Sequence, residues 1–227
     1  TTASPNQIVR FTLPNNALLN LKSFAFRFQA TTGGTGAFAR LPHDISTLIE
    51  RVEVTSSGVS LASGSNFYNV LKQAMTALKG DYCDPVLSHP DMVRAVSYVD
   101  GAAKAANETY TGTQALFAID KWEGFLGSSG PGILDSSLMG ELVISLTLAD
   151  NNVLSSSIGT TLPGTAAGTD FDVDGNGNST YSLSQMYATI ECMSLASSGY
   201  DEMVQGVIAE VGFLEIPFKQ YFSFQDT

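Results

Sequence analysis

The sharpest chemical motif in the sequence is a run of oxygen-bearing side chains at alternate positions. Asp170, Asp172, Asp174 and Asn176 are each separated by one residue, and a glycine follows the last aspartate. This pattern matches the first half of an oxygen-rich calcium loop, in which the glycine permits a tight turn. The place of the bidentate glutamate is taken by Tyr181, so Ca²⁺ would need oxygens from elsewhere. A solvated acidic turn is the alternative interpretation, because Asp, Asn and Gly are good turn formers.

Residues suited to nucleophilic or metal-dependent catalysis are scarce. The two histidines, His43 and His89, each adjoin a proline, and the two cysteines, Cys83 and Cys192, lie far apart in the chain. Cys83 with His89 could form a thiol–imidazole pair, but no motif supplies an orienting partner or an oxyanion hole. Esterase-type, zinc-protease and Walker-type motifs are all missing. We expect no enzymatic activity and no required cofactor, and two reduced, buried thiols.

The charge of the chain is sparse and one-sided. Eleven Lys and Arg residues stand against 22 Asp and Glu residues, giving a net charge of −11. Proteins that bind nucleic acids need stripes of Lys and Arg to displace counterions from phosphates, and here the basic residues are single. Direct contact with nucleic acid is therefore not expected. No apolar run reaches eighteen residues, so any contact with a membrane would be at its surface.

Alternation of apolar and polar residues dominates the chain and predicts half-buried strands. The clearest case is Phe24, Phe26 and Phe28, which alternate with Ala25 and Arg27. The same pattern predicts a strand near the C-terminus at 214–218, where Pro217 indicates an edge or a strand end. The Gly/Ser/Thr-rich segment 150–180 is expected to be a long loop. Further strands are expected at 9–13, 52–54, 142–148 and 186–192.

One stretch has helical rather than strand periodicity. Apolar residues from Phe67 to Leu78 recur at i, i+3 and i+4, with Ser65 as a candidate N-cap and Gly80 as a stop. This spacing predicts an amphipathic helix at about 66–79. Its apolar face is interpreted as core, with a partner-binding face as the alternative. Shorter helices are expected after Pro90 and over 200–209.

Many short strands, one conspicuous helix and no alternating βαβ pattern indicate an all-β fold. Among antiparallel β-sandwiches, the jelly roll tolerates long loops at its ends. The sequence therefore predicts an antiparallel jelly-roll β-sandwich.

Several segments, in order along most of the chain, resemble the double jelly-roll major capsid proteins of tailless icosahedral bacteriophages that enclose an internal membrane. The similarity lies in the types and spacing of residues, not in a catalytic fingerprint. The segments are 41–44 leading into 49–54, 65–71, 122–126 leading through Pro131 to Leu138 and 142–148, 181–183, 200–203 and 216–218.

This resemblance implies a structural coat protein of the virion, made in the host cytoplasm. It implies homotrimers of two-barrel subunits, forming pseudo-hexagonal capsomers that contact neighbouring capsomers over an internal lipid membrane. A different, penton protein would occupy the vertices. A membrane between coat and genome would also account for the acidic charge of the chain.

Two divisions of the chain are compatible with the resemblance. In the first, residues 1–197 form the first barrel, and 198–227 form a crossover and the start of a second barrel. In the alternative, two minimal barrels divide near residue 110. A different function also remains open, that of a calcium-dependent carbohydrate-binding jelly-roll module. It is suggested by the acidic segment and by Trp122, since exposed aromatic rings can stack on sugars.

Overall fold

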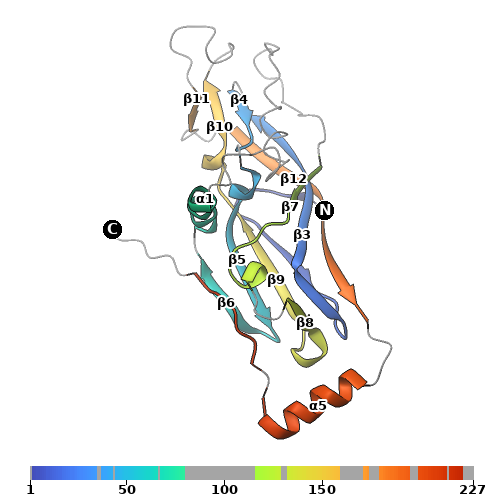
Figure 1. The fold of residues 1–227 in the computed structure, drawn as a ribbon. Coiled ribbons are helices and arrows are strands. Elements are labelled where there is room, and N and C mark those ends of the chain that lie inside the picture. Colours follow the sequence, from blue (N-terminus) through green and yellow to red (C-terminus); the bar gives the residue numbers. More distant parts are fainter. Residues whose placement is uncertain are drawn as a thin grey trace.

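The strands of the protein run along the length of an elongated molecule, seen here in a computed structural model (Figure 1). Short strands gather at one end, and a helix lies beyond the other end. The structure describes residues 2–34, 37–42, 44–65, 67–79, 116–128, 132–158, 171–173, 179–194, 199–213 and 215–221.

Two antiparallel sheets make up the body of the molecule. The first has the order β1-β12-β3, and the free side of β3 is shared end to end by β7 and β8, which pair with Phe26–Gln29 and Leu18–Asn20. The second has the order β2-β9-β5-β6. The strands of the first sheet are β1 (Thr2–Ala3), β3 (Leu18–Gly34), β7 (Leu116–Ile119), β8 (Ile133–Asp135) and β12 (Ser179–Met193). Those of the second are β2 (Ile8–Thr12), β5 (Ile49–Ser56), β6 (Val59–Ser65) and β9 (Leu142–Leu148).

The path of the chain between these sheets identifies the topology. When β7 and β8 are taken as one strand position, successive strands alternate between the sheets, apart from the hairpin of β5 and β6. The last strand, β12, lies between the first and the third, which is the eight-strand order of two Greek keys. The chain is an antiparallel jelly roll.

The strand order also bears on how the chain is divided. Strands from before and after residue 110 occur in both sheets, so a boundary at that residue would cut each sheet in two. The eight strand positions are complete by Met193, and a helix follows at Gly199–Val211. Whether 198–227 begins a second barrel stays a prediction.

The hydrophobic core fills the space between the two sheets. Phe24, Phe26 and Phe28 have no exposed surface, as their alternation predicted, and neither has Phe117 on the neighbouring strand β7. In β9 the burial alternates residue by residue, because successive side chains of a strand point to opposite faces. The strands predicted at 9–13, 52–54, 142–148 and 186–192 are all present: β2 and β9 match within one residue, whereas β5 and β12 extend well beyond the predicted bounds.

The segment expected to be a loop, 150–180, contributes strands instead. β10 (Ser155–Ile158) pairs with β4 (Ala37–Arg40) on one side and with β11 (Phe171–Val173) on the other. These three strands form a small sheet at one end of the molecule (Figure 1). Sequence reasoning missed them because β4 and β10 pair across more than a hundred residues, while Ser- and Gly-rich composition is typical of loops.

The predicted helix at about 66–79 is present as α1 (Tyr68–Lys79), which lies beside the sandwich (Figure 1). Ser65 is not its N-cap, because it pairs with Val52 at the end of β6. A second predicted helix is α5 (Gly199–Val211), at the far end of the molecule. The helix expected after Pro90 lies outside the described residues. The remaining short helices are η1 (Ile45–Leu48), α4 (Phe125–Ser128), η3 (Ser136–Leu138) and η4 (Asn151–Val153).

The strand expected at 214–218 is not a strand. Residues 215–221 follow α5 without regular structure and lie against β5, β6 and α4. The two apolar side chains that suggested a strand lie against the body of the molecule instead. Ile216 packs on the core, and the Phe218 ring lies 5.0 Å from that of Phe125. Pro217 lacks the N–H that a sheet ladder requires.

Candidate functional site

The proposed calcium ligands lie at the edge of what the structure describes. Asp172 is in β11, where it is paired with Ser156 of β10, and Asp170, Asp174 and Asn176 lie outside the described residues. Within the described ranges no group of three or more His, Cys, Asp or Glu side chains is placed to hold a metal ion. Calcium binding by the acidic segment stays a prediction.

Of the residues considered for thiol chemistry, His43, Cys83 and His89 lie outside the described part of the chain. Cys192 is a free thiol, as expected, but it is exposed rather than buried. It lies near the end of β12, where it is paired with Leu19 of β3.

Trp122 lies in the core. Its side chain is 6% exposed, its Nε1 donates a hydrogen bond of 2.8 Å to the Phe24 carbonyl, and its ring lies 5.6 Å from the Phe24 ring and 6.2 Å from that of Tyr68. A Cβ at Gly127 would collide with the Trp122 carbonyl, so this turn requires glycine. Trp122 therefore has no free face for stacking on a sugar, which removes the aromatic residue that suggested carbohydrate binding.

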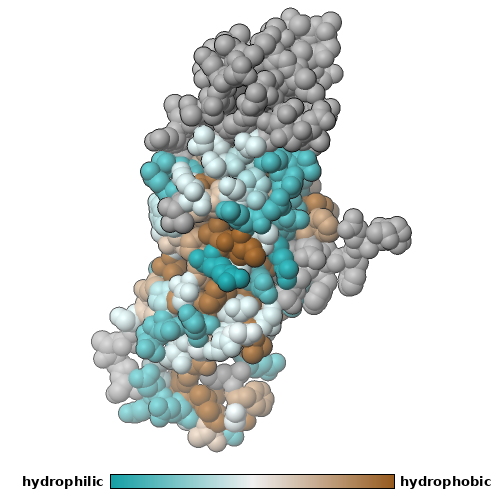
Figure 2. Space-filling view, turned by 180° about the vertical axis from the view of Figure 1, so that it is seen from behind, coloured by the Kyte–Doolittle hydropathy of each residue, from teal (hydrophilic) through white to brown (hydrophobic). Residues whose placement is uncertain are grey.

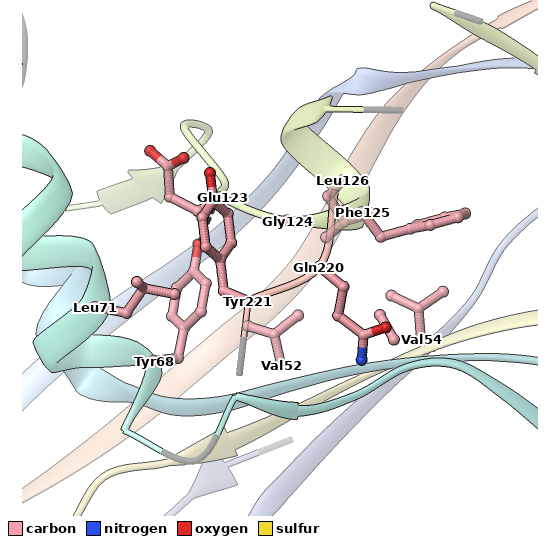
Figure 3. Close-up of a pocket in the computed structure, with 11 residues that line it drawn as sticks. Val52, Val54, Tyr68, Leu71, Glu123, Gly124, Phe125, Leu126, Gln220 and Tyr221 are labelled. Carbon is pink, nitrogen blue, oxygen red and sulfur yellow. Dashed lines mark hydrogen bonds between the residues drawn. The ribbon is translucent and has the colours of Figure 1, made fainter. Parts of the chain in front are cut away.

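Beside Trp122, helix α1 buries a polar face against the barrel, and Figure 3 shows Tyr68 of this face next to Glu123. Lys72 Nζ lies 3.5 Å from Glu123 Oε1, with both side chains largely buried. The Glu123 backbone N–H donates a hydrogen bond of 2.9 Å to the Tyr68 hydroxyl. Burial, together with the negative charges of Glu123 and Asp44, raises the pKa of Tyr68, so its phenol stays neutral. This network fixes α1 to the turn before α4.

The most buried residues of α1 are not the apolar ones that the sequence indicated, although Leu71 packs against the core. Val70 and Leu78 are 60% and 83% exposed, whereas Tyr68, Lys72 and Thr76 are buried. These three follow each other at a spacing of four residues, which is the signal that could have revealed them. The apolar residues misled the prediction, because a lysine such as Lys72 is buried only when it has a partner. That partner, Glu123, is distant in the sequence.

The hollow next to this network is small. It measures about 20 Å³ and lies between β5, β6, α1, α4 and the C-terminal segment, where Gln220 and Tyr221 border it (Figure 3). A water molecule needs roughly 10–15 Å³, while pockets for small ligands measure about 300 Å³ or more. This hollow has room for about one water molecule.

Larger hollows lie where α5 faces the body of the molecule. One, of about 530 Å³, is bordered largely by apolar side chains, among them Ile133, Leu138, Ile208 and Phe213. The other, of about 400 Å³, is bordered by polar residues such as Asn16 and Ser137. Tyr200 and Asp135 border both. Partial burial and the neighbouring Asp135 raise the pKa of Tyr200.

Helix α5 has no buried residue. Met203, Val207 and Val211, which share one helical face, are 60%, 40% and 53% exposed, and Phe213 just after the helix is 62% exposed. In Figure 2 apolar residues also reach the surface at the α5 end and across the middle of the molecule. The charged residues of α5 are all acidic: Asp201, Glu202 and Glu210.

The comparisons with known proteins give only distant matches. No known protein family and no curated protein matches the chain. The quasi-atomic model of the PBCV-1 virus capsid matches at 17% identity and a TM-score of 0.42, covering 90% of this chain and 42% of that one. The crystal structure of PBCV-1 VP54, fitted into a reconstruction of the virophage Sputnik, matches at 16% identity and a TM-score of 0.39, with 86% and 41% covered.

The chain thus spans about two fifths of the length of either structure that it matches. Similarity at this level does not carry an assignment of function. The fold assignment rests on the strand order of the chain itself. No helix in the described ranges is long and apolar enough to cross a membrane.

Proposed function

We propose that the chain is a structural subunit of a viral capsid and has no catalytic site. The observation that carries this proposal is the complete jelly-roll strand order over residues 2–193, in a chain whose ordered sequence segments resemble jelly-roll capsid proteins. The side chains in the body of the barrel support it: Trp122, Tyr68, Lys72 and Glu123 are engaged in holding the barrel together.

The finer proposal concerns assembly. The subunits form homotrimeric, pseudo-hexagonal capsomers that pack against neighbouring capsomers in the icosahedral shell of a bacteriophage virion, with penton proteins at the vertices. The shell lies over an internal membrane that it contacts only at the surface, and the subunits are made in the host cytoplasm. The net charge of −11 supports a coat that does not contact the genome directly.

Exposed apolar side chains on α5 and Phe213 supply a contact surface for such an assembly. Apolar residues that gather on an exposed face are typical of interaction sites. A helix that lies on lipid usually carries Lys and Arg on its polar face, whereas the charged residues of α5 are acidic. We therefore assign this face to contact between proteins.

The test of the proposed function is the assembly state of the purified chain. Light scattering after size-exclusion chromatography should give trimers, and negative-stain micrographs should show hexagonal particles, sheets or shells at high concentration. A strictly monomeric protein at high concentration, with and without Ca²⁺, would overturn the proposal.

Calcium binding at the acidic segment is a separate proposal within this function. A ligand that binds only the folded state raises its stability, so Ca²⁺ should raise the thermal midpoint of the wild type. Replacing Asp170, Asp172 and Asp174 with Asn should abolish that rise and leave the midpoint in chelator unchanged. Mg²⁺ at the same concentration serves as the ionic-strength control. If Ca²⁺ does not raise the wild-type midpoint, the segment is only a turn.

A further inference from the structure

Half of β12 has an edge that no described strand covers. Along one side, β12 pairs with β3 as far as Met193. Along the other, β1 pairs only with Leu183 and Ser184. The stretch 185–193 therefore has backbone N–H and C=O groups on its outer side without a partner strand among the described residues. In Figure 1 this half of β12 forms the outer border of the molecule.

The part of β12 that follows the first bulge is continuous. Gln185 and Met186 together oppose the single residue Phe28, which is a bulge in β12. The second irregularity is on the partner strand, because there the four residues 21–24 of β3 oppose Ile190 alone. From Tyr187 to Met193 the strand is uninterrupted and about 24 Å long, at roughly 3.4 Å per residue.

The sandwich is also incomplete along this side. The inward side chains Met186, Ala188 and Ile190 pack on the core but stay half-buried, and so do Val9 and Phe11 on β2, the edge strand of the opposite sheet. A strand placed beside β12 would cover this apolar surface and continue the first sheet.

The edge lacks the residues that usually prevent such pairing. Natural edge strands are protected by lysines, prolines or inward-pointing charges. From Ser179 to Met193 there is no Lys, Arg or Pro, and the one charged residue, Glu191, is exposed and accepts a hydrogen bond of 2.8 Å from Asn20. The bulge at 185–186, which is a protective feature, lies before the stretch 187–193.

We infer that the 187–193 edge of β12 pairs with the same edge of a second copy of this chain, antiparallel, about a two-fold axis through Ile190. This register aligns the stretch 187–193 with itself and leaves β1 in place. Inward, Ile190 faces Ile190 of the partner and Ala188 faces Cys192. Outward, Thr189 faces Glu191 and Tyr187 faces Met193. All inward pairs are apolar, and no like charges face each other.

A cysteine on the two-fold axis tests the geometry. Residues facing each other in an antiparallel pair have Cα atoms about 4.5–5.5 Å apart, within the range for a disulfide. Ile190→Cys, in a chain with Cys83→Ser and Cys192→Ser, should give disulfide-linked dimers on mild oxidation. Val59→Cys in the same background is the control, since Val59 is 66% exposed at the start of the edge strand β6. Equal cross-linking of both variants, or none at residue 190, would overturn the inference.

Opposite charges at residue 189 test the register without disturbing the core. Thr189 is exposed and would face Glu191 of the partner twice in the dimer. Thr189→Glu should weaken dimerisation about five-fold and Thr189→Lys should strengthen it about five-fold, because each cross-strand charge pair contributes modestly. Both changes in the dissociation constant should become smaller at high salt. Sedimentation equilibrium measures them, and dissociation constants that shift equally in both variants would contradict the register.

This inference is independent of the proposed capsid function. A dimer can form through β12 in a protein that builds no shell, and a shell can form from trimers that lack this contact. Cross-linking at residue 190 therefore reports on the edge alone.

Discussion

At the scale of single residues, the buried polar groups hold the molecule together. Lys72, Glu123 and Tyr68 join α1 to the turn before α4, and the Tyr181 hydroxyl donates a hydrogen bond to the Ala149 carbonyl. A buried phenol is costly to ionise, and burial raises the pKa of both Tyr68 and Tyr181. The stability of the fold should therefore fall at alkaline pH, where these phenols ionise more readily in the unfolded chain.

Tyr68 should make the free energy of unfolding fall at alkaline pH. Its pKa is raised above the ordinary value of about 10, so its contribution to stability is complete below pH 10 and is lost as the pH rises further. Above pH 10 each such tyrosine should lower the free energy of unfolding by up to about 1.4 kcal/mol per pH unit. Urea denaturation between pH 9 and 11.5 should show a shallower decline for Tyr68→Phe than for the wild type. Identical slopes would contradict burial of this phenol in the folded state.

At the scale of elements, the two main helices differ in how they use their apolar residues. Helix α1 buries Tyr68, Lys72 and Thr76 and leaves Val70 and Leu78 exposed, because its position is set by the polar network. Helix α5 is connected to the body mainly through Tyr200, near Asp135, and through the segment that follows it. Its apolar face is thus available to another subunit.

Substitution on α5 should separate assembly from folding. The double variant Met203→Glu, Val207→Glu should change the free energy of unfolding of the subunit by no more than about 0.5 kcal/mol, since both side chains are exposed. It should abolish trimers if this face is a subunit contact. Gln205→Glu, on the polar face, is the control and should keep them. Light scattering and chemical denaturation measure the two effects, and trimers that survive in the double variant would exclude this face.

At the scale of the whole molecule, β12 is the last strand of the jelly roll, and the segment after α5 adds a further contact with the barrel. Residues 215–221 lie beside β5, β6 and α4, and the Phe218 ring contacts that of Phe125. The strand order therefore predicts that the barrel does not depend on this segment for its topology.

A chain ending at residue 197 should accordingly fold in one cooperative transition. It should be less stable than the full chain by about 1–3 kcal/mol, because Ile216 no longer packs on the core and Phe218 no longer covers Phe125. Urea denaturation followed by circular dichroism measures both properties. Full-chain Phe218→Ala should reproduce part of the loss. Failure of the shortened chain to fold, or no loss of stability, would contradict this view of the C-terminal segment.

The sequence by itself determined the local structure. Period-two alternation located the strands around Phe26, Leu146 and Ala188, and helical spacing located α1, because burial on one face imposes its period on the residues. The sequence did not reveal the end sheet of β4, β10 and β11, the buried Lys72–Glu123 pair or the open edge of β12. Each of these depends on partners distant along the chain, so only the tertiary structure decided them.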